Sequence, residues 1–316
     1  MTTFIVRRLL VAIVQLLVVV TLVFFLLYLL PGDPVLVILG SEGATDATAV
    51  AAVRERLGLD RPLWRQYLGW LGDLSRLDLG VSLLDGTPVW RDIAARLPRT
   101  LELVGIAVGL GAIFGVLLGT LAALRRGGLA DWTLVTFTTL GISVPVYVIG
   151  SLAILVFALQ LGWLPTSGFR AFSVDPVEHV RRLIMPALTL SIAPTAIITR
   201  MMRSSLLEVL RADYVRTARA KGLAPVRVLA FHAIRTSLIP IVTVIGLQLG
   251  TLIGGSVLVE HVFNWPGISS LLIAAIHRRD YGVVQGVIVV TASLFILINL
   301  LVDLAYGALD PRIRHD

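Results

Sequence analysis

Six long apolar runs alternate with polar, arginine-containing segments along the chain. A bilayer core about 30 Å thick is crossed by roughly 20 helical residues, and each run reaches about that length. The runs are residues 9–30, 101–124, 132–161, 183–202, 238–259 and 283–306. The pattern therefore predicts an all-α integral membrane protein with six transmembrane helices.

Two of these runs need interpretation. Residues 9–30 carry no charge and exceed the roughly 7–15 apolar residues of a signal peptide, so we expect an uncleaved anchor helix. Residues 132–161 are interrupted by Pro145. Because the pieces on either side of this proline would each be too short to cross, the run is interpreted as a single kinked or tilted helix.

The segment between the first two runs, residues 31–99, is long enough to hold structure of its own. We expect helices over residues 50–57, ending before Gly58, over residues 63–77 and from Pro88 to Leu97. The apolar positions of the middle helix share one face and are Trp64, Tyr67, Leu68, Leu71 and Leu74. The segment is either a small cap on the membrane surface or a docking surface for an external partner.

A second polar connection covers residues 203–237. We expect one helix over residues 203–221 that stops at Gly222, and another that starts at Pro225 and runs through His232. Two short helices joined at a glycine would form a rigid protrusion. Its basic side chains also fit a solvated hairpin attracted to anionic lipid.

Composition supports a membrane protein, and the charges predict its orientation. Hydrophobic residues make up 57% of the chain and charged residues 15%, with a mean hydropathy of +0.90. If both termini lie inside, the inner connections hold 14 of the 27 basic residues, the two short outer loops hold five, and segment 31–99 holds eight. This bias predicts cytoplasmic termini. It also explains the net charge of +7 without a nucleic-acid partner.

Several kinds of chemistry find no support. There is no cysteine, and the only lysine, Lys221, is not in a phosphate-binding G-K-[ST] sequence. The histidines lack metal-ligand spacing, so solvent-facing or interfacial positions are expected for His179, His232, His261, His277 and His315. The spans hold Glu102 and Asp303 only near their ends. We therefore expect neither an enzyme nor an ion-driven pump, with no metal and no cofactor bound by this chain.

Neutral polar and small residues recur within the spans. Polar side chains that could line a translocation pathway, or form hydrogen bonds between helices, are Ser191, Thr195, Thr199, Gln248 and Thr251. Glycines at four-residue spacing are Gly111, Gly115 and Gly119 in the second run and Gly246, Gly250 and Gly254 in the fifth. This spacing predicts close helix packing.

Short motifs distributed over nearly the whole chain give it a family resemblance. They are Leu30-Pro31-Gly32-Asp33-Pro34, Arg56-Leu57-Gly58-Leu59-Asp60, Asp78-Leu79-Gly80-Val81-Ser82, Arg96-Leu97-Pro98, Gly162-Trp163-Leu164-Pro165, Glu260-His261-Val262-Phe263-Asn264-Trp265-Pro266-Gly267 and Leu309-Asp310-Pro311-Arg312. Together they resemble the permease subunits of bacterial ABC importers of the dipeptide, oligopeptide and nickel family. The chain is similar to the first of the two permeases that such systems pair.

The polar connection is similar to the E-A-A-x3-G signature by which importer permeases engage their ATPases. Arg216-Thr217-Ala218 stands where E-A-A would be, while Gly222 matches. The resemblance implies an ATPase-coupling loop made by Asp213, Tyr214, Arg216, Thr217, Ala218, Arg219, Ala220, Lys221, Gly222, Leu223, His232 and Arg235.

What the resemblance implies can be stated as a set of expectations. The fold would be that of a type I ABC importer permease, multi-pass in the bacterial cytoplasmic membrane. The partners would be a second permease, one or two ATPases that bind ATP and Mg²⁺, and an external solute-binding protein. The substrates would be di- or oligopeptides, with nickel chelates or glutathione as alternatives. From the residues alone, a stand-alone secondary carrier and a membrane-anchored scaffold remain open.

Overall fold

The computed structural model describes residues 2–29, 35, 39, 46–57 and 59–309. The motif at residues 30–34, the expected helix-ending Gly58 and the end of the chain from Asp310 lie outside the described residues. Within the described part, the regular structure is helical apart from one isolated bridge between Val81 and Pro88. The expectation of an all-α chain is confirmed.

Four helices are long and apolar enough to cross a bilayer, and two bent helix pairs bring the number to as many as six. The four apolar stretches are Ile5–Phe25, Val89–Leu124, Pro176–Val209 and Tyr281–Leu304, and the bent pairs are Leu129–Ser143 with Val146–Gln160 and Pro225–Ser237 with Ile239–Gly255. These counts refer to the described residues. They agree with the six runs expected from the sequence.

The chain divides into two compact units. Unit 1 contains Met1–Arg8, Thr100–Pro266 and Leu297–Asp316, and unit 2 contains Leu9–Arg99 and Gly267–Ile296. Three helices belong to both units: α1 (Thr2–Leu29), α5 (Val89–Leu124) and α15 (Tyr281–Leu309).

Unit 1 is a group of helices packed around the long helix α8. Besides parts of α1, α5 and α15, its elements are α6 (Leu129–Ser143), α7 (Val146–Ala153), the π-helix η1 (Ile154–Gln160), α8 (Pro176–Val209), α9 (Asp213–Ala220), α10 (Pro225–Arg227), the π-helix η2 (Val228–Ile234), α11 (Arg235–Ser237), α12 (Ile239–Gly255) and α13 (Val257–Val262). Its buried core includes Ile198, Met202 and Leu206 of α8. These side chains pack with Ala233 of η2 and Ile241 of α12.

The apolar run at 132–161 differs from a single kinked helix. It forms α6 and then α7 with η1, and the two parts meet at 101°. Val144 is extended, with φ −86° and ψ 128°, because a proline disfavours the helical region for the residue before it. Pro145 then caps α7, whose first turn does not need the missing N–H. Proline thus separates two helices here.

The prolines inside two other helices do not end them. Pro186 and Pro194 lie within the continuous α8, which extends beyond both ends of the apolar run at 183–202. Pro98 lies within α5, so the short helix expected from Pro88 to Leu97 is the beginning of a 36-residue helix. Membrane helices tolerate interior proline when neighbouring groups satisfy the freed carbonyls.

Helix α5 packs closely against α8 through three of its glycines. A Cβ added at Gly111 would lie 2.6 Å from Pro194 Cβ, and one at Gly115 would lie 2.6 Å from Ile198 Cβ. At Gly119 the nearest atom is the carbonyl oxygen of Thr199, also at 2.6 Å. The expectation that these glycines serve helix packing is confirmed. In α12, a Cβ added at Gly246 would likewise collide with Val302 of α15, whereas a Cβ added at Gly254 would have no atom within 4 Å.

Unit 2 combines segment 46–99 with α14 (Ile268–Arg278) and the neighbouring part of α15. The helices expected between the first two spans are present as α3 (Ala47–Leu57) and α4 (Leu63–Ser75). Tyr67 and Trp70 of α4 make ring contacts with Phe24 of α1. Trp64 and Leu68, expected on the packed face, are exposed instead, and Trp70 occupies that face.

A short turn connects this segment to α15. Asp280 accepts hydrogen bonds from the Ser82 hydroxyl and from the backbone N–H groups of Leu83 and Val283. Gly282 lies so close to Val81 that an added Cβ would be 2.5 Å from the Val81 carbonyl oxygen. Thus one buried carboxylate joins the 78–88 turn to the start of α15.

Candidate functional site

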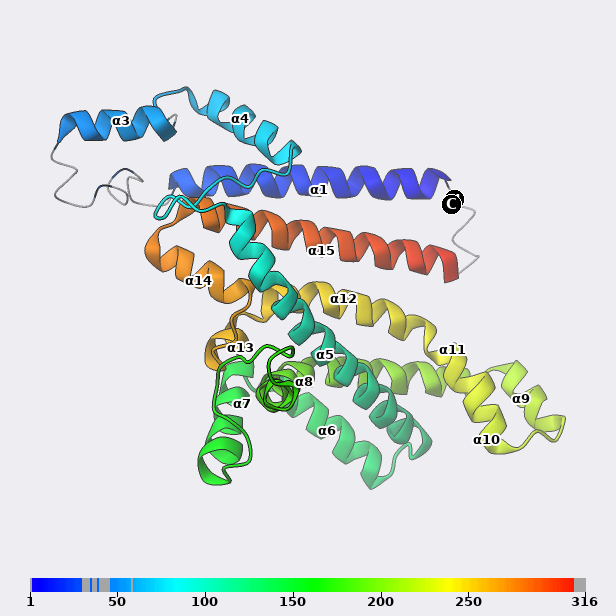
Figure 1. Cartoon of the computed structure of the whole chain (residues 1–316). Helices are drawn as coiled ribbons and strands as arrows, with labels where there is room; N and C mark the ends of the chain where they lie inside the picture. The colour runs from blue at the N-terminus through cyan, green and yellow to red at the C-terminus, as the bar shows by residue number, and fades with distance from the viewer. Residues whose placement is uncertain (1, 30–34, 36–38, 40–45, 58, 310–316) are drawn as a thin grey trace. The chain divides into compact units, whose positions relative to one another are not determined.

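The polar connection forms a helical hairpin, which we call the 213–235 hairpin. It projects from the ends of α8 and α12 (Figure 1). Its first arm is α9, and its second arm runs through α10 and η2 into α11. Val215 and Ala218 of the first arm pack on Val228 of the second, with Leu223 beside them. The hairpin therefore has a small apolar core of its own.

Gly222 makes the turn between the arms. Its φ is +77°, in the left-handed region that favours glycine, and an added Cβ would meet nothing within 4 Å. The N–H of Gly222 donates to Arg219 O at 2.9 Å, and that of Leu223 donates to Ala218 O at 3.4 Å. This is the Schellman arrangement that ends a helix. The expected helix stop at Gly222 and start at Pro225 are confirmed.

The first arm differs in one respect from the sequence interpretation. Instead of one helix over 203–221, the chain leaves the helix after Val209 and starts α9 at Asp213. Ala212 has the extended ψ of 146° that precedes a helix, and Asp213 lies in the first turn, where a carboxylate favours the N-terminal end. The break lets α9 turn away from α8.

The hairpin presents basic and apolar side chains together. Its exposed basic residues are Arg216, Arg219, Lys221, Arg227 and Arg235, and Arg211 is exposed just before it. Tyr214, Val226 and Phe231 are also exposed. His232 is half-buried, Thr217 and Ala220 are exposed, and the Asp213–Arg216 ion pair at 3.4 Å is almost fully in solvent. Exposed large apolar side chains on a rigid tip are typical of a surface that a partner covers.

A buried ion pair lies near the base of the hairpin. Arg203 of α8 donates from Nε to Asp131 Oδ1 at 2.6 Å and from a terminal nitrogen to Oδ2 at 2.7 Å. The N–H of Gly127 also donates to this carboxylate, whose side chain is 6% exposed. A bidentate pair of this kind fixes both distance and orientation. It ties the start of α6 to the part of α8 from which the hairpin leaves.

The five polar residues proposed to line a pathway are distributed over two helices. Ser191 and Thr199 are buried in α8, Thr195 and Gln248 are half-buried, and Thr251 is exposed. The hydroxyls of Ser191, Thr195 and Thr251 donate to backbone carbonyls of their own helices. Thr199 Oγ1 has no hydrogen-bond partner among the described residues. The hydroxyl protons of Ser191, Thr195 and Thr251 are therefore donated within their own helices and not to a neighbouring helix.

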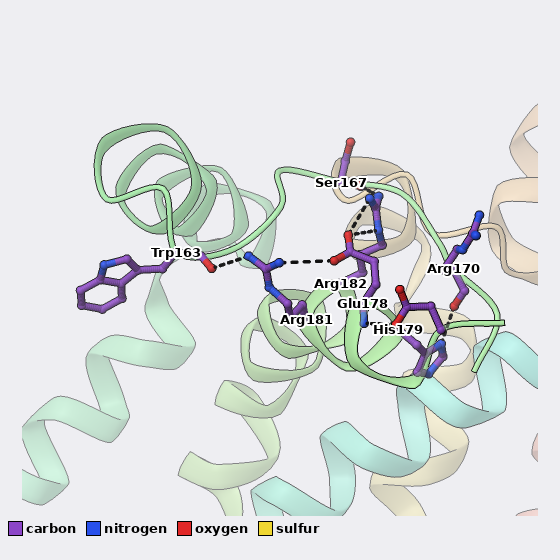
Figure 2. A network of polar contacts seen from close by, with 8 residues as sticks. Trp163, Ser167, Arg170, Glu178, His179, Arg181 and Arg182 are labelled. Atoms are coloured by element: carbon purple, nitrogen blue, oxygen red, sulfur yellow. Dashed lines mark hydrogen bonds and ion pairs between the residues drawn. The ribbon is translucent and has the colours of Figure 1, made fainter. Parts of the chain in front are cut away.

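At the opposite end of α8, charged residues form what we call the 163–182 network (Figure 2). Arg182 donates to Glu178 at 2.8 Å and to the Ser167 carbonyl at 2.7 Å. Arg181 reaches the Trp163 carbonyl at 3.2 Å. Asp175 caps α8 by accepting the N–H of Glu178 at 3.0 Å. These contacts fold the connection between η1 and α8 onto the first turns of α8.

His179 is buried in the same network, so the solvent-facing position considered for it is wrong. Its Nδ1 lies 2.6 Å from the Arg170 carbonyl oxygen, and its Nε2 lies 2.9 Å from Glu102 Oε1 of α5. The rings of Phe169, Phe172 and Trp265 surround it edge-on, with centroids 5.7, 5.6 and 6.1 Å away. Sequence spacing gave no sign of this pair, because its members are 77 positions apart.

A further buried carboxylate, Glu260, lies at the end of α13. It accepts hydrogen bonds from Thr100 at 2.7 Å and from Ser256 at 3.1 Å. The segment that follows is held against the 163–182 network, because Gly168 N–H donates to the Phe263 carbonyl at 2.8 Å. The motif at 260–267 thus belongs to the scaffold of this end of unit 1.

Comparison with known proteins agrees with this arrangement. Residues 115–315 match the family of binding-protein-dependent transport system inner membrane components, and residues 1–104 match the N-terminal part of such components. The methionine ABC transporter MetNI, in an inward-facing conformation, has a similar fold, with a TM-score of 0.56 at 20% identity over 69% of this chain and 96% of that chain. The fold is therefore that of an ABC importer permease.

Relatives with curated names cover the full length. The chain is 46% identical to the di/tripeptide transport permease DppB of Pseudomonas aeruginosa and 40% identical to the dipeptide permease DppB of Escherichia coli, covering 100% of this chain and 99% of each relative. It is 42% identical to the glutathione permease GsiC of Escherichia coli over the whole of both chains. The chain belongs to the family of inner membrane permease subunits of binding-protein-dependent ABC importers.

Proposed function

We propose that this chain forms half of the transmembrane pathway of an ATP-driven importer of di- and oligopeptides. The proposal places it in a bacterial cytoplasmic membrane with both termini inside, as its arginine distribution predicts. It pairs with a second permease and receives substrate from an external solute-binding protein. Two full-length relatives, one named for di/tripeptide and the other for dipeptide transport, support the peptide substrate.

The observation that carries the proposal is the 213–235 hairpin. Its rigid turn at Gly222 presents exposed Tyr214, Val226 and Phe231 among basic side chains. In the proposed complex this tip lies in a groove of an ATPase subunit, where burial of its apolar side chains favours binding. One or two ATPase subunits bind ATP and Mg²⁺, and this chain binds no cofactor.

Energy then reaches the pathway through the hairpin. ATP binds the closed ATPase dimer more tightly than the open one, and this difference in affinity shifts the permease between inward-open and outward-open states. Ser191, Thr195, Thr199, Gln248 and Thr251 are proposed to contact the passing solute, since weakly binding neutral groups allow release on the far side. Segment 46–99 is proposed to help receive the binding protein.

Glutathione is a second candidate substrate, because the permease GsiC is also related over its full length at 42% identity. Glutathione is itself a tripeptide with one unusual linkage, so the two candidates share amide and carboxylate groups. Nickel chelates are a third class, which the family resemblance leaves open.

The test is uptake by the reconstituted assembly. The chain is co-expressed with its neighbouring transport subunits, purified in mild detergent and placed in liposomes, and uptake of radiolabelled dialanine is measured with the binding protein outside. We expect uptake that requires ATP and Mg²⁺ on the ATPase side and that unlabelled dipeptide inhibits.

Inhibition of dialanine uptake by unlabelled compounds distinguishes the candidate substrate classes. Stronger inhibition by glutathione or by a nickel–histidine chelate than by dipeptide would reassign the substrate class. Recovery of the chain alone, with uptake that needs no ATP, would contradict the importer proposal and favour a secondary carrier.

A further inference from the structure

The contacts of His179 require more protons than a neutral imidazole carries. Both ring nitrogens lie within hydrogen-bond distance of an oxygen: Nδ1 of the Arg170 carbonyl at 2.6 Å and Nε2 of the Glu102 carboxylate at 2.9 Å. A carbonyl and an ionised carboxylate only accept, and a neutral imidazole has one N–H. One contact would therefore place two acceptors against each other, whichever way the ring is turned.

A second proton resolves this conflict. It can be on the imidazole, which then donates to both oxygens, or on the Glu102 carboxyl, which then donates to Nε2. The imidazole cannot turn to water instead, because its side chain is 3% exposed and three aromatic rings surround it. Glu102 is 34% exposed, so the shared proton can exchange with solvent through its carboxyl group.

The other charged groups around His179 are occupied elsewhere. On α8, Glu178 pairs with Arg181 and Arg182. In the preceding loop, Asp175 caps the helix, and the Arg170 guanidinium points away from the imidazole (Figure 2).

On α5, Arg99 lies one turn before Glu102. The remaining neighbouring element, α13, contributes no further charge to the pair. On α13, Glu260 accepts from Thr100 and Ser256, and His261 is exposed. Glu102 is therefore the charged side chain that contacts the imidazole among the residues that the structure describes.

We propose that Glu102 and His179 share this proton and act as a pH-dependent clasp between α5 and the start of α8. The closed clasp holds one proton more than the open state, in which neutral His179 and ionised Glu102 are apart. Low pH therefore favours closure.

The clasp controls more than two side chains. Arg170 and the capped start of α8 belong to the 163–182 network, so opening frees the connection between η1 and α8 from α5. The orientation proposed above places this end of unit 1 outside the cytoplasm, where the pH is that of the surroundings of the cell.

A distance measurement tests the clasp directly. The natural chain has no cysteine, so spin labels can be attached at Ser173→Cys in the loop and Gly105→Cys on α5, both exposed positions. The full chain, assembled with cysteine-free partner subunits in nanodiscs, is studied by pulsed electron resonance at pH 5.5 and 8.0. We expect a narrow distance distribution at pH 5.5 and a broader, longer one at pH 8.0.

Two variants make the result specific. In Glu102→Gln, the amide N–H can donate to Nε2 of a neutral imidazole, so the narrow distribution is expected at both pH values. In Glu208→Gln, which removes an exposed carboxylate at the far end of α8, the wild-type pH dependence is expected. A Glu102→Gln variant that still broadens at pH 8.0, or a wild type unchanged between the two pH values, would overturn the proposal. No substrate is needed, so the result does not depend on which substrate the assembly transports.

Discussion

At the scale of single residues, backbone conformation and buried charge matter more than side-chain volume at the hairpin. Gly222 has room for a side chain but a left-handed backbone. Arg203 and Asp131 are placed by a bidentate contact rather than by apolar packing. Each feature can be tested by a substitution with a matched control.

Gly222→Val is expected to disrupt coupling because a β-branched residue is strained at φ +77°. The left-handed conformation costs roughly 1–2 kcal/mol for a residue with a Cβ. We expect at least a severalfold loss of ATP-dependent uptake, with normal insertion in the membrane, measured in proteoliposomes. Gly162→Val is the control, since Gly162 has φ +65° and equally open surroundings but lies outside both the hairpin and segment 46–99. Equal losses in both variants would contradict a special role for the hairpin turn.

Removal of Arg203 is expected to destabilise unit 1. Arg203→Met leaves the buried Asp131 carboxylate without its ionic partner, and loss of one partner of a buried pair costs about 3 kcal/mol. We expect a clearly lower unfolding temperature in detergent. Arg216→Met is the control for stability, because the Asp213–Arg216 pair is exposed and contributes little.

A double variant tests whether Arg203→Met loses stability because the Asp131 carboxylate is left unpaired. Asp131→Asn combined with Arg203→Met removes both charges, so it should be less destabilised than the sum of the single variants. Strict additivity would mean that the two side chains do not stabilise each other.

At the scale of elements, helix contacts depend on which glycines face a neighbour. Gly111, Gly115 and Gly119 recur every four residues and bring the backbone of α5 against α8. Gly105 and Gly109 are on the same helix but would give a Cβ open space. The four-residue spacing alone could predict a packed face on α5. It could not predict which glycines of the helix do not face α8.

Gly115→Ala and Gly109→Ala should therefore change the stability of the protein in opposite directions, the first lowering it and the second raising it. The first forces Ile198 and the α5 backbone apart, and overpacking of this kind costs about 1–3 kcal/mol. The second adds a methyl group in open space, and alanine is the better helix former. Unfolding of the two variants in detergent, followed by circular dichroism, measures the difference. Equal stabilities would show that α5 can move away from α8 without cost.

The 78–88 turn of unit 2 is expected to depend on one hydroxyl. Ser82→Ala removes a donor to the buried Asp280 carboxylate, which also accepts hydrogen bonds from the N–H groups of Leu83 and Val283. Hydrogen–deuterium exchange of peptides covering 78–88 should become faster, while peptides from α9 stay unchanged. Thr48→Ala, in an exposed turn beside Asp46, provides a control that should leave the 78–88 peptides unaffected.

At the scale of the whole molecule, periodicity predicted the helices well and their breaks less well. The apolar runs around 9–30 and 183–202 correspond to α1 and α8 because a run of apolar residues must be helical in a bilayer. The 101° break at Pro145 and the exit from α8 after Val209 were not predicted. Proline is present both at a break and within continuous helices, so neighbouring packing decides which outcome occurs.

In the candidate site, too, local features could be predicted from the sequence, but contacts between distant residues could not. The hairpin was predictable because glycine, proline and charge mark it locally in the sequence. The pairs Glu102–His179, Asp131–Arg203 and Ser82–Asp280 join residues 72 to 198 positions apart. Only the packing of the helices brings such residues together.

The proposed orientation can be tested with single cysteines in this cysteine-free chain. Ser173→Cys and Ala220→Cys lie at exposed positions in the 163–182 network and in the 213–235 hairpin. In intact cells, a membrane-impermeant maleimide should label the first, and label the second only after permeabilisation. The reverse pattern would contradict cytoplasmic termini.

Helix α8 carries both regions of the site at its two ends. It continues without interruption from Pro176 to Val209, and its 34 residues span about 50 Å at 1.5 Å per residue. If one end of a helix of this length is held, a tilt of about 10° displaces the other end by roughly 9 Å. A small rotation of α8 at the hairpin would therefore move the 163–182 network by more than the length of a side chain. The helix itself would couple the two regions.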